Sequence, residues 1–199
     1  MNDFPAEYSA EERRWLLRLA HWSIRAAVTG TALPAELFED ELGAEARAHL
    51  RQKRGAFTTL HENGELRGCI GMVMAVKPLD ETVREMARAA ALEDPRFAPV
   101  VEAELGSLQL EISVLSPMFV IAPEDVVVGR HGLMVTYGGH RGLLLPQVAG
   151  EWGWDRETLL AQTCRKAGLP PEQWKQGAQL EAFTAEVFGE TEPGESLRK

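Results

Sequence analysis

Apolar residues near the start of the chain recur at helical spacing: Trp15, Leu19, Trp22 and Ala26. Ser9 and Glu12 precede this run in the arrangement of a capping box, in which each side chain accepts from the backbone amide of the other residue. Gly30 and Pro34 follow the run and are typical of a helix end. The pattern therefore predicts a helix that begins near Ser9 and ends before Gly30.

Two glycine-containing dipeptides predict tight hairpins. Asn63-Gly64 accepts a positive φ at both turn positions, and Gly138-Gly139 does the same. The strands expected on either side of these turns are 56–62 and 65–73, and 131–137 and 140–145. A two-residue turn also fixes which residues of the two strands lie opposite each other.

The remaining periodicity predicts a short helix at 44–51, helices at 78–92 and 155–167, and strands at 107–115 and 179–188. Helices intermixed with antiparallel hairpins indicate an α+β fold, an antiparallel sheet with helices packed on it. We expect a single domain over residues 1–188, followed by a mobile acidic tail at 189–199.

The charge balance limits the classes of partner. The chain has 21 basic and 30 acidic residues, a formal charge of −9, which opposes binding to nucleic acid and to acidic membranes. No stretch reaches the roughly 18 uncharged apolar residues of a membrane helix, and the acidic N-terminus does not resemble a signal peptide. Cys69 and Cys164 lie far apart, outside C-x-x-C spacing, which suits a reducing compartment. We expect a cytoplasmic protein.

Several kinds of catalytic site are missing from the sequence. It contains no phosphate loop, no dinucleotide-binding glycine motif and no nucleophile elbow. The five histidines show no H-x-x-x-H spacing. His131 and His140 share a face of the predicted hairpin but lie six positions apart, roughly 20 Å at ~3.3 Å per residue. We therefore expect neither a metal site nor a cofactor.

The most informative segment is Arg67-Gly68-Cys69-Ile70-Gly71. Two glycines so close together weaken a strand and indicate close approach of another backbone or a ligand. The predicted register pairs Thr58 with Cys69. The face that it leaves open carries Thr58, Leu60, Arg67, Cys69 and Gly71, and the core face carries Phe57, His61, Leu66 and Ile70. Arg67 then lies beside Cys69, where its charge favours the thiolate.

Two interpretations of Cys69 remain open. As a nucleophile it needs a base from a distant segment, His131 or His140, because the predicted register turns His61 to the opposite face. Free cysteine is also among the most buried residue types, and the residues alone favour a packing role. Cys164, in the middle of a predicted helix, is interpreted as a core residue.

A second polar group is predicted at the end of the 140–145 strand. The register places His131 opposite Pro146, so Gln147 is expected close to His131. Asp94 and Arg96 are expected to form a turn and an ion pair that hold their loop. Groups of this kind are more often satisfied polar contacts than catalytic residues.

Seven motifs follow one another along the chain: Arg67–Gly71, Asp94–Phe97, Ile112–Pro117, His131–Leu133, Arg141–Gln147, Gly153–Asp155 and Cys164–Leu169. From about Ser9 to Glu190 the chain resembles the AMMECR domain family, known in microbes as AmmeMemoRadiSam system protein A. The resemblance implies an α+β fold with a larger and a smaller lobe, and a family core centred on Arg67–Gly71. It also implies association with a Memo-type protein and a radical S-adenosylmethionine enzyme. The three-cysteine cluster of such an enzyme is missing here, so radical chemistry belongs to a partner.

Three functions are compatible with these observations. The first is a non-catalytic binding component of such a system, and the second is an enzyme with Cys69 as nucleophile, Arg67 lowering the thiol pKa and His131 as base. The third is a nucleic-acid or regulatory adaptor, and the charge disfavours direct contact with nucleic acid. The residues expected to bind a partner or an unidentified small molecule are Arg67, Gly68, Gly71, Arg96 and Gln147.

Overall fold

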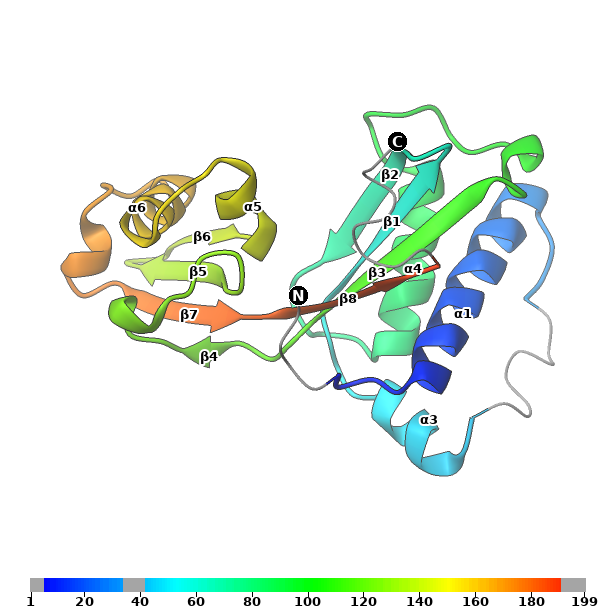
Figure 1. Cartoon of the computed structure of the whole chain (residues 1–199), viewed down its shortest axis with the longest axis horizontal. Coiled ribbons are helices and arrows are strands. Elements are labelled where there is room, and N and C mark those ends of the chain that lie inside the picture. Colours follow the sequence, from blue (N-terminus) through cyan, green and yellow to red (C-terminus); the bar gives the residue numbers. More distant parts are fainter. Residues whose placement is uncertain (1–5, 34–41, 191–199) are drawn as a thin grey trace. The chain divides into compact units, whose positions relative to one another are not determined.

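The computed structural model describes residues 6–33 and 42–190. The chain divides into two units (Figure 1). The first unit contains the residues up to Val114 and those from Glu186 onwards, and the second is Leu115–Ala185. Pro34, expected after the end of the first helix, and residues 191–199 of the predicted tail lie outside the described residues.

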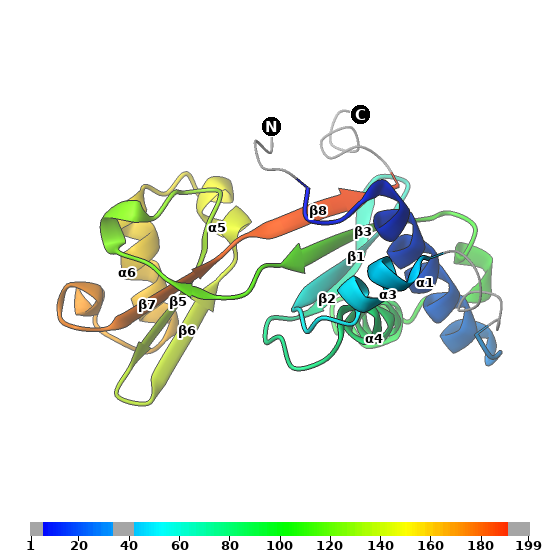
Figure 2. The same cartoon turned by 90° about the horizontal axis from the view of Figure 1, so that it is seen from below.

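The first unit is built on a four-stranded sheet with the order β2-β1-β3-β8, in which β1 pairs antiparallel with both of its neighbours. Its strands are β1 (Ala56–Glu62), β2 (Glu65–Met72), β3 (Leu108–Leu115) and β8 (Ala185–Gly189). Its helices are α1 (Ala10–Thr29), α3 (Ala44–Leu50), α4 (Leu79–Leu92) and the 3-10 turn η1 (Glu102–Glu104). Figure 2 shows α1 and α4 together on one side of this sheet.

Local sequence signals account for the start and end of α1. The Ser9 hydroxyl accepts from the Glu12 amide at 3.2 Å, and the Glu12 carboxylate accepts from the Ser9 amide at 2.8 Å, so the predicted capping box is confirmed. Gly30 ends the helix in the left-handed region, with φ 70°. The core between the helices and the sheet includes Leu16, Leu19, Ile24, Leu60, Leu79, Val83 and Ile112.

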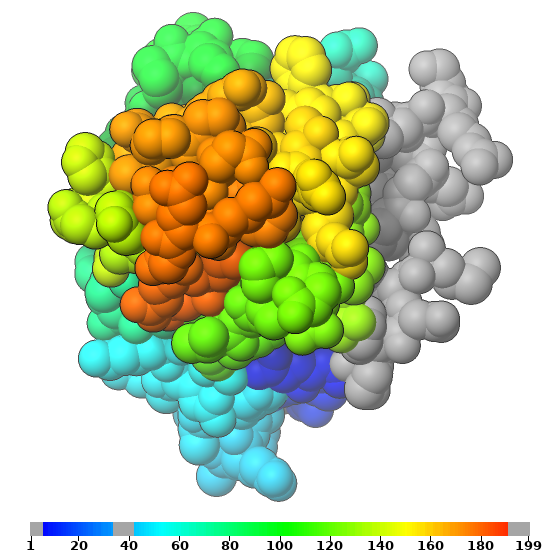
Figure 3. Space-filling model, turned by 90° about the vertical axis from the view of Figure 1, so that its left-hand side faces the viewer, coloured from blue at the N-terminus to red at the C-terminus, as the bar shows by residue number. Residues whose placement is uncertain are grey.

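The second unit has its own four-stranded sheet, with the order β4-β7-β5-β6. Its strands are β4 (Phe119–Val120), β5 (Gly132–Tyr137), β6 (His140–Leu144) and β7 (Gln179–Phe183). Its helices are α5 (Pro146–Glu151) and α6 (Arg156–Lys166), with 3-10 turns η2 (Pro123–Asp125) and η3 (Gln173–Lys175). In Figure 3 this unit faces the viewer, with the α5 region in yellow and the segment after α6 in orange.

Cys164 lies in the core of the second unit, as predicted, with its side chain fully buried. Burial raises the pKa of its thiol. The Asp155 side chain accepts from the Thr158 amide at 2.8 Å and caps α6, which confirms the predicted start of this helix.

The α+β architecture is confirmed, but the predicted strand at 179–188 is wrong. It consists of two strands, β7 and β8, which are separated at Thr184 and belong to different sheets. Gly189 is the last residue of β8, and the Glu190 carboxylate accepts from the Leu110 amide at 3.0 Å. None of the described helices is long and apolar enough to cross a membrane.

Candidate functional site

The pairing of β1 with β2 contains a β-bulge that the turn did not predict. Past the turn, β2 carries one additional residue, Arg67, which has no partner in β1. Thr59 rather than Thr58 therefore lies opposite Cys69, and the predicted pairing is wrong by one residue.

This shift exchanges the two faces of β1, because successive strand residues point to opposite sides. The β1 residues that point into the core are Ala56, Thr58 and Leu60. The half-buried residues on the other face are Phe57, Thr59 and His61. The prediction that His61 points away from Cys69 is thus also wrong.

We call this second face the Cys69 face. Cys69 and Thr59 lie in one row with Glu111 of β3, and His61 lies in the next row opposite Gln109. The full set is Phe57, Thr59, His61, Cys69, Gly71, Gln109, Glu111 and Ser113. All eight side chains or backbone positions are half-buried. The predicted register places Cys69 and Gly71 on this open face as the structure does, but it places Phe57 and His61 on the core face, which is wrong.

Asp94 and Arg96 hold the backbone of Cys69 at the edge of the sheet. The Cys69 amide donates to Asp94 Oδ2 at 2.9 Å, and its carbonyl accepts from the Arg96 guanidinium at 3.2 Å. Arg96 also donates to both carboxylate oxygens of Asp94, at 2.9 and 2.7 Å. These contacts satisfy the edge peptide groups that an additional strand would otherwise bind.

The same contacts fix the charge state of Asp94. Its side chain is only 2% exposed, and the Arg96 guanidinium holds the pKa of this carboxyl well below its usual range. The expectation that Asp94 and Arg96 form an ion pair is confirmed. The hydrogen bonds of these two side chains to the Cys69 backbone were not expected, because contacts between distant segments leave no periodic signal in the sequence.

Arg67 extends from the bulge to the segment that follows α4. Its guanidinium donates to both carboxylate oxygens of Glu104, at 2.8 and 3.1 Å, and to the Ala98 carbonyl at 2.9 Å. The Arg67 hydrogen bonds and charge lower the pKa of Glu104. Arg67 thus ties the bulge to η1, a role for which the sequence gave no partner.

The two glycines of the motif are required by close packing on opposite faces of β2. A Cβ atom at Gly68 would lie 2.3 Å from the Ala90 carbonyl oxygen, at the C-terminal part of α4. A Cβ atom at Gly71 would lie 2.1 Å from the Phe57 ring, which covers it on the Cys69 face. The neighbours predicted from these glycines are therefore a helix backbone and an aromatic ring.

The Cys69 thiol has polar neighbours in Thr59 and Arg96. The Thr59 hydroxyl lies 3.4 Å from Cys69 Sγ and donates to it. Cys69 is half-buried, in contrast to the fully buried Cys164. Because His61 follows Thr59 by two residues, it lies on the same face of the sheet as Cys69, one row further along β1.

His131, the base suggested by the sequence, belongs to the second unit and has a local role there. Its Nδ1 accepts from the Val127 amide at 3.1 Å, so the neutral ring carries its proton on Nε2. Burial and the nearby Arg130 lower its pKa. The ring packs edge-on against Phe119, with the ring centroids 5.9 Å apart.

Gln147 lies exposed in the first turn of α5, also in the second unit. Among residues 6–33 and 42–190, no three His, Cys, Asp or Glu side chains come together in a group that could hold a metal ion. The residues that the structure gathers around Cys69 are therefore Thr59, His61, Asp94 and Arg96.

Comparison with known proteins identifies the family. Residues 17–188 match the AMMECR1 family. Protein MJ0810 of Methanocaldococcus jannaschii is 46% identical over 159 residues, which cover 74% of this chain and 79% of that protein. Protein Mbar_A1807 of Methanosarcina barkeri is 41% identical over 195 residues, covering 94% and 95%.

A solved structure supports the same assignment. The crystal structure of the uncharacterized protein PH0010 from Pyrococcus horikoshii matches with a TM-score of 0.74 and 39% identity. The match covers 92% of this chain and 94% of that one. Residues 17–188 include both the bulged strand at Arg67 and the motifs of the second unit, and the chain belongs to the AMMECR1 family.

Proposed function

We propose that this AMMECR1-family protein is a cytoplasmic binding component that acts with a Memo-type protein and a radical S-adenosylmethionine enzyme. The Cys69 face is the surface that it offers to a ligand or partner. This face combines a thiol, a hydroxyl, an imidazole and a carboxylate on a sheet whose backbone is held in place at Cys69. A rigid polar surface of this kind suits recognition, because little ordering is needed when the partner binds.

One observation carries this proposal: both motif arginines are engaged in ion pairs that order the Cys69 segment. Arg67 is bound to Glu104, and Arg96 is bound to Asp94. The Arg67 guanidinium is thus committed to Glu104, whereas Arg96 interacts with both Asp94 and the Cys69 side chain. These contacts therefore do not favour the activation of the Cys69 thiol by Arg67 that the sequence suggests. They favour a binding role for the Cys69 segment.

A second function, a thiol-dependent enzyme, is favoured by the contact between Thr59 and Cys69 and by His61 on the same face. In that reaction Cys69 Sγ bonds to an acyl carbon of a small molecule or peptide, the bond from that carbon to the departing group breaks, and water then hydrolyses the thioester on Cys69. The thiol proton passes to a histidine, which returns it to the departing group. Within the first unit, His61 is the candidate for that histidine, because it lies on the same face as Cys69.

The two functions are separated by Cys69→Ser, examined together with the wild type. A binding component forms a complex with the Memo-type protein in analytical ultracentrifugation, and the substitution weakens that complex while leaving the melting temperature within ~2 °C. Thr163→Ser, at a buried hydroxyl in the second unit, is the control for a conservative buried change. Turnover of a thioester by the isolated chain, lost in Cys69→Ser, would instead establish the enzyme.

A different result for Cys69→Ser would contradict the proposed role of the Cys69 face. If Cys69→Ser lowers the melting temperature strongly and leaves the complex intact, Cys69 is a packing residue. The Cys69 face then has no part in binding.

A further inference from the structure

Glu111 is the acidic residue of the Cys69 face. Its side chain is half-buried, and none of the hydrogen bonds or ion pairs among the described residues involves its carboxylate. Glu111 lies opposite Thr59, and Thr59 lies opposite Cys69, so the three side chains form one row across β3, β1 and β2. Neighbouring strands are about 4.8 Å apart, which puts the backbones of Glu111 and Cys69 roughly 10 Å from each other.

The strand beyond Glu111 supplies no side chain to this row. Gly189 of β8 is the neighbour there, since a Cβ atom built on it would lie 3.5 Å from both Cα and Cβ of Glu111. In the next row, His61 and Gln109 also make no hydrogen bond to a described residue. The Glu111 carboxylate is thus partly withdrawn from water without a cation beside it, a state that an incoming cation would relieve.

The two arginines at the other end of the face are already paired. Arg67 lies 2.8 Å from the Glu104 carboxylate, and Arg96 lies 2.7 Å from that of Asp94. Each pair has no net charge. The negative charge of Glu111 is therefore not balanced by the charged side chains that surround Cys69.

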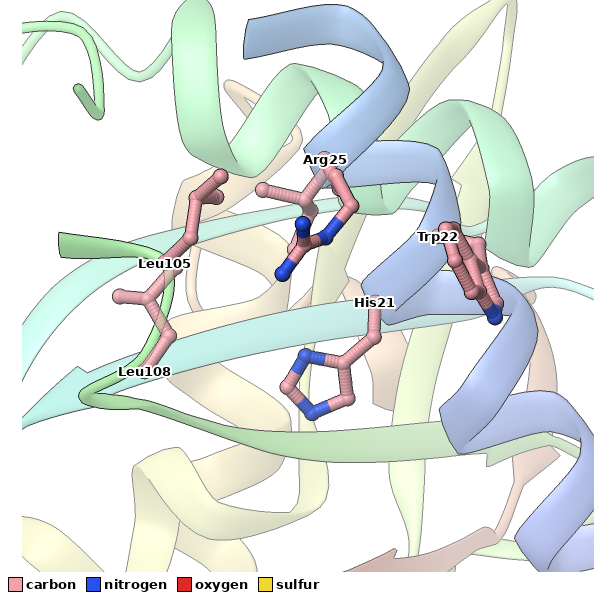
Figure 4. Close-up of a pocket in the computed structure, with 6 residues that line it drawn as sticks. His21, Trp22, Arg25, Leu105 and Leu108 are labelled. Atoms are coloured by element: carbon pink, nitrogen blue, oxygen red, sulfur yellow. The ribbon is translucent and has the colours of Figure 1, made fainter. Parts of the chain in front are cut away.

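The acidic residues of the β8 segment belong to the helix side of the sheet. Glu186 binds Arg13 of α1 at 2.9 Å, and Glu190 Oε1 lies 2.6 Å from His21 Nε2. Figure 4 shows His21 extending from α1 on the side where Leu105 and Leu108 lie. Neither of these glutamates supplies a positive charge to Glu111, so the sign of the Cys69 face stays negative.

We propose that Glu111 binds a lysine or arginine side chain of the partner protein, and that the segment carrying this side chain lies over Thr59 and Cys69. This inference rests on the proposed function for the existence of a partner, and it assigns the chemistry of the contact. A cation is favoured because a carboxylate or phosphate would bring a second unbalanced negative charge beside Glu111. His61 and Gln109 offer hydrogen-bonding groups to the same segment in the adjacent row.

Disulfide exchange at Cys69 measures the charge preference without the partner. The full chain is equilibrated at pH 8 and low salt with cystamine and cysteamine, or with dithiodipropionate and mercaptopropionate, and mass spectrometry gives the fraction of each mixed disulfide. The two adducts are matched, because each has two carbons between the sulfur and the charged group. Cys164 is buried and serves as the internal control.

The measured quantity is the equilibrium constant for the ammonium adduct divided by that for the carboxylate adduct. Glu111→Gln lowers this ratio by about threefold or more, since it removes a charge within reach of the adduct. Glu111→Asp, which keeps the charge, restores most of the ratio. The control is Glu65→Gln, at an exposed carboxylate near the turn of the same hairpin, and it leaves the ratio unchanged. Melting curves verify that the variants remain folded.

Three results would overturn the cation site. The ratio could be the same in the wild type and in Glu111→Gln, or Glu65→Gln could lower it equally. Cys69 could also form no mixed disulfide with either reagent, which would show that the row is closed to ligands.

Ultracentrifugation with the Memo-type protein distinguishes this inference from the proposed function. We expect Glu111→Gln to weaken that complex and Glu65→Gln to leave it intact. If the complex forms and Glu111→Gln does not weaken it, the inference is wrong and the proposed function stands. If no complex forms while the ammonium preference depends on Glu111, the cation site stands and the proposed partner is wrong.

Discussion

Replacing Asp94 by asparagine tests whether the hydrogen bonds that hold the Cys69 backbone stabilise the fold. The carboxylate accepts from the Cys69 amide at 2.9 Å and from Arg96 at 2.9 and 2.7 Å, and its side chain is 2% exposed. Asparagine keeps the shape, loses the charge and turns an NH₂ group toward one donor. A hydrogen bond to a charged group contributes about 1.5–3 kcal/mol.

The expected loss is smaller than the sum of these bonds. The Arg96 side chain is 54% exposed, so water screens its attraction to Asp94 and solvates it when the pair is broken. The Cys69 amide accounts for most of the effect. We expect Asp94→Asn to lower the free energy of unfolding by about 2 kcal/mol at pH 7, measured by urea unfolding.

The effect depends on pH in a defined direction. The folded-state pKa of Asp94 lies well below the ordinary value of 3.8, so near pH 3 the unfolded chain binds a proton that the folded chain does not. The contribution of ionised Asp94 to the free energy of unfolding is complete above about pH 5 and is lost as the pH falls through the folded-state pKa. Between pH 7 and pH 3 the difference between wild type and Asp94→Asn therefore shrinks by about 1 kcal/mol.

Asp125→Asn is the control, because Asp125 is exposed in η2 and is expected to change stability by less than about 0.5 kcal/mol. Equal stability of Asp94→Asn and wild type at pH 7 would refute the reasoning. So would a difference that grows on acidification, since it would require the folded carboxyl to bind its proton more tightly than the unfolded one.

Two further predictions concern packing and the thiols. Gly68→Ala lowers the melting temperature by more than 5 °C because its Cβ would lie 2.3 Å from the Ala90 carbonyl oxygen. Gly106→Ala is the control and has almost no effect, because the space around Gly106 is open. Equal melting temperatures of the two variants would contradict the packing argument. In alkylation followed by mass spectrometry, half-buried Cys69 is labelled in the folded protein and buried Cys164 only after unfolding, since burial raises its pKa. Rapid labelling of Cys164 in the native protein would contradict its place in the core.

Most elements of the fold could be predicted because their signals are local. The Ser9 capping box, the Asn63-Gly64 turn and the Asp155 cap each depend on residues within a few positions, and all three form. The junction at Thr184 could not be found in this way. The apolar pattern of β7 and β8 is continuous along the chain, and only the pairing partners show that the two strands belong to different sheets.

The faces of the β1–β2 hairpin were predicted incorrectly for a related reason. A two-residue turn determines the register only until the first bulge, and Arg67 shifts every later pair by one residue. What holds that bulge is the ion pair from Arg67 to Glu104, which are 37 positions apart. A single sequence carries no signal for a contact over that distance, so His61 was assigned to the wrong face.

Within the motif Arg67–Gly71, the residues that hold the structure together can be distinguished from Cys69 by their contacts. Arg67, Gly68 and Gly71 each have a structural partner: Glu104, the Ala90 carbonyl and the Phe57 ring. Cys69 differs, because its backbone is held by Asp94 and Arg96 while its thiol interacts with the Thr59 hydroxyl and the Arg96 guanidinium. The scaffold residues thus position a side chain that the fold itself does not require. Substitutions of the scaffold should impair stability and binding together, and changes at Cys69, Thr59 and His61 can separate the two.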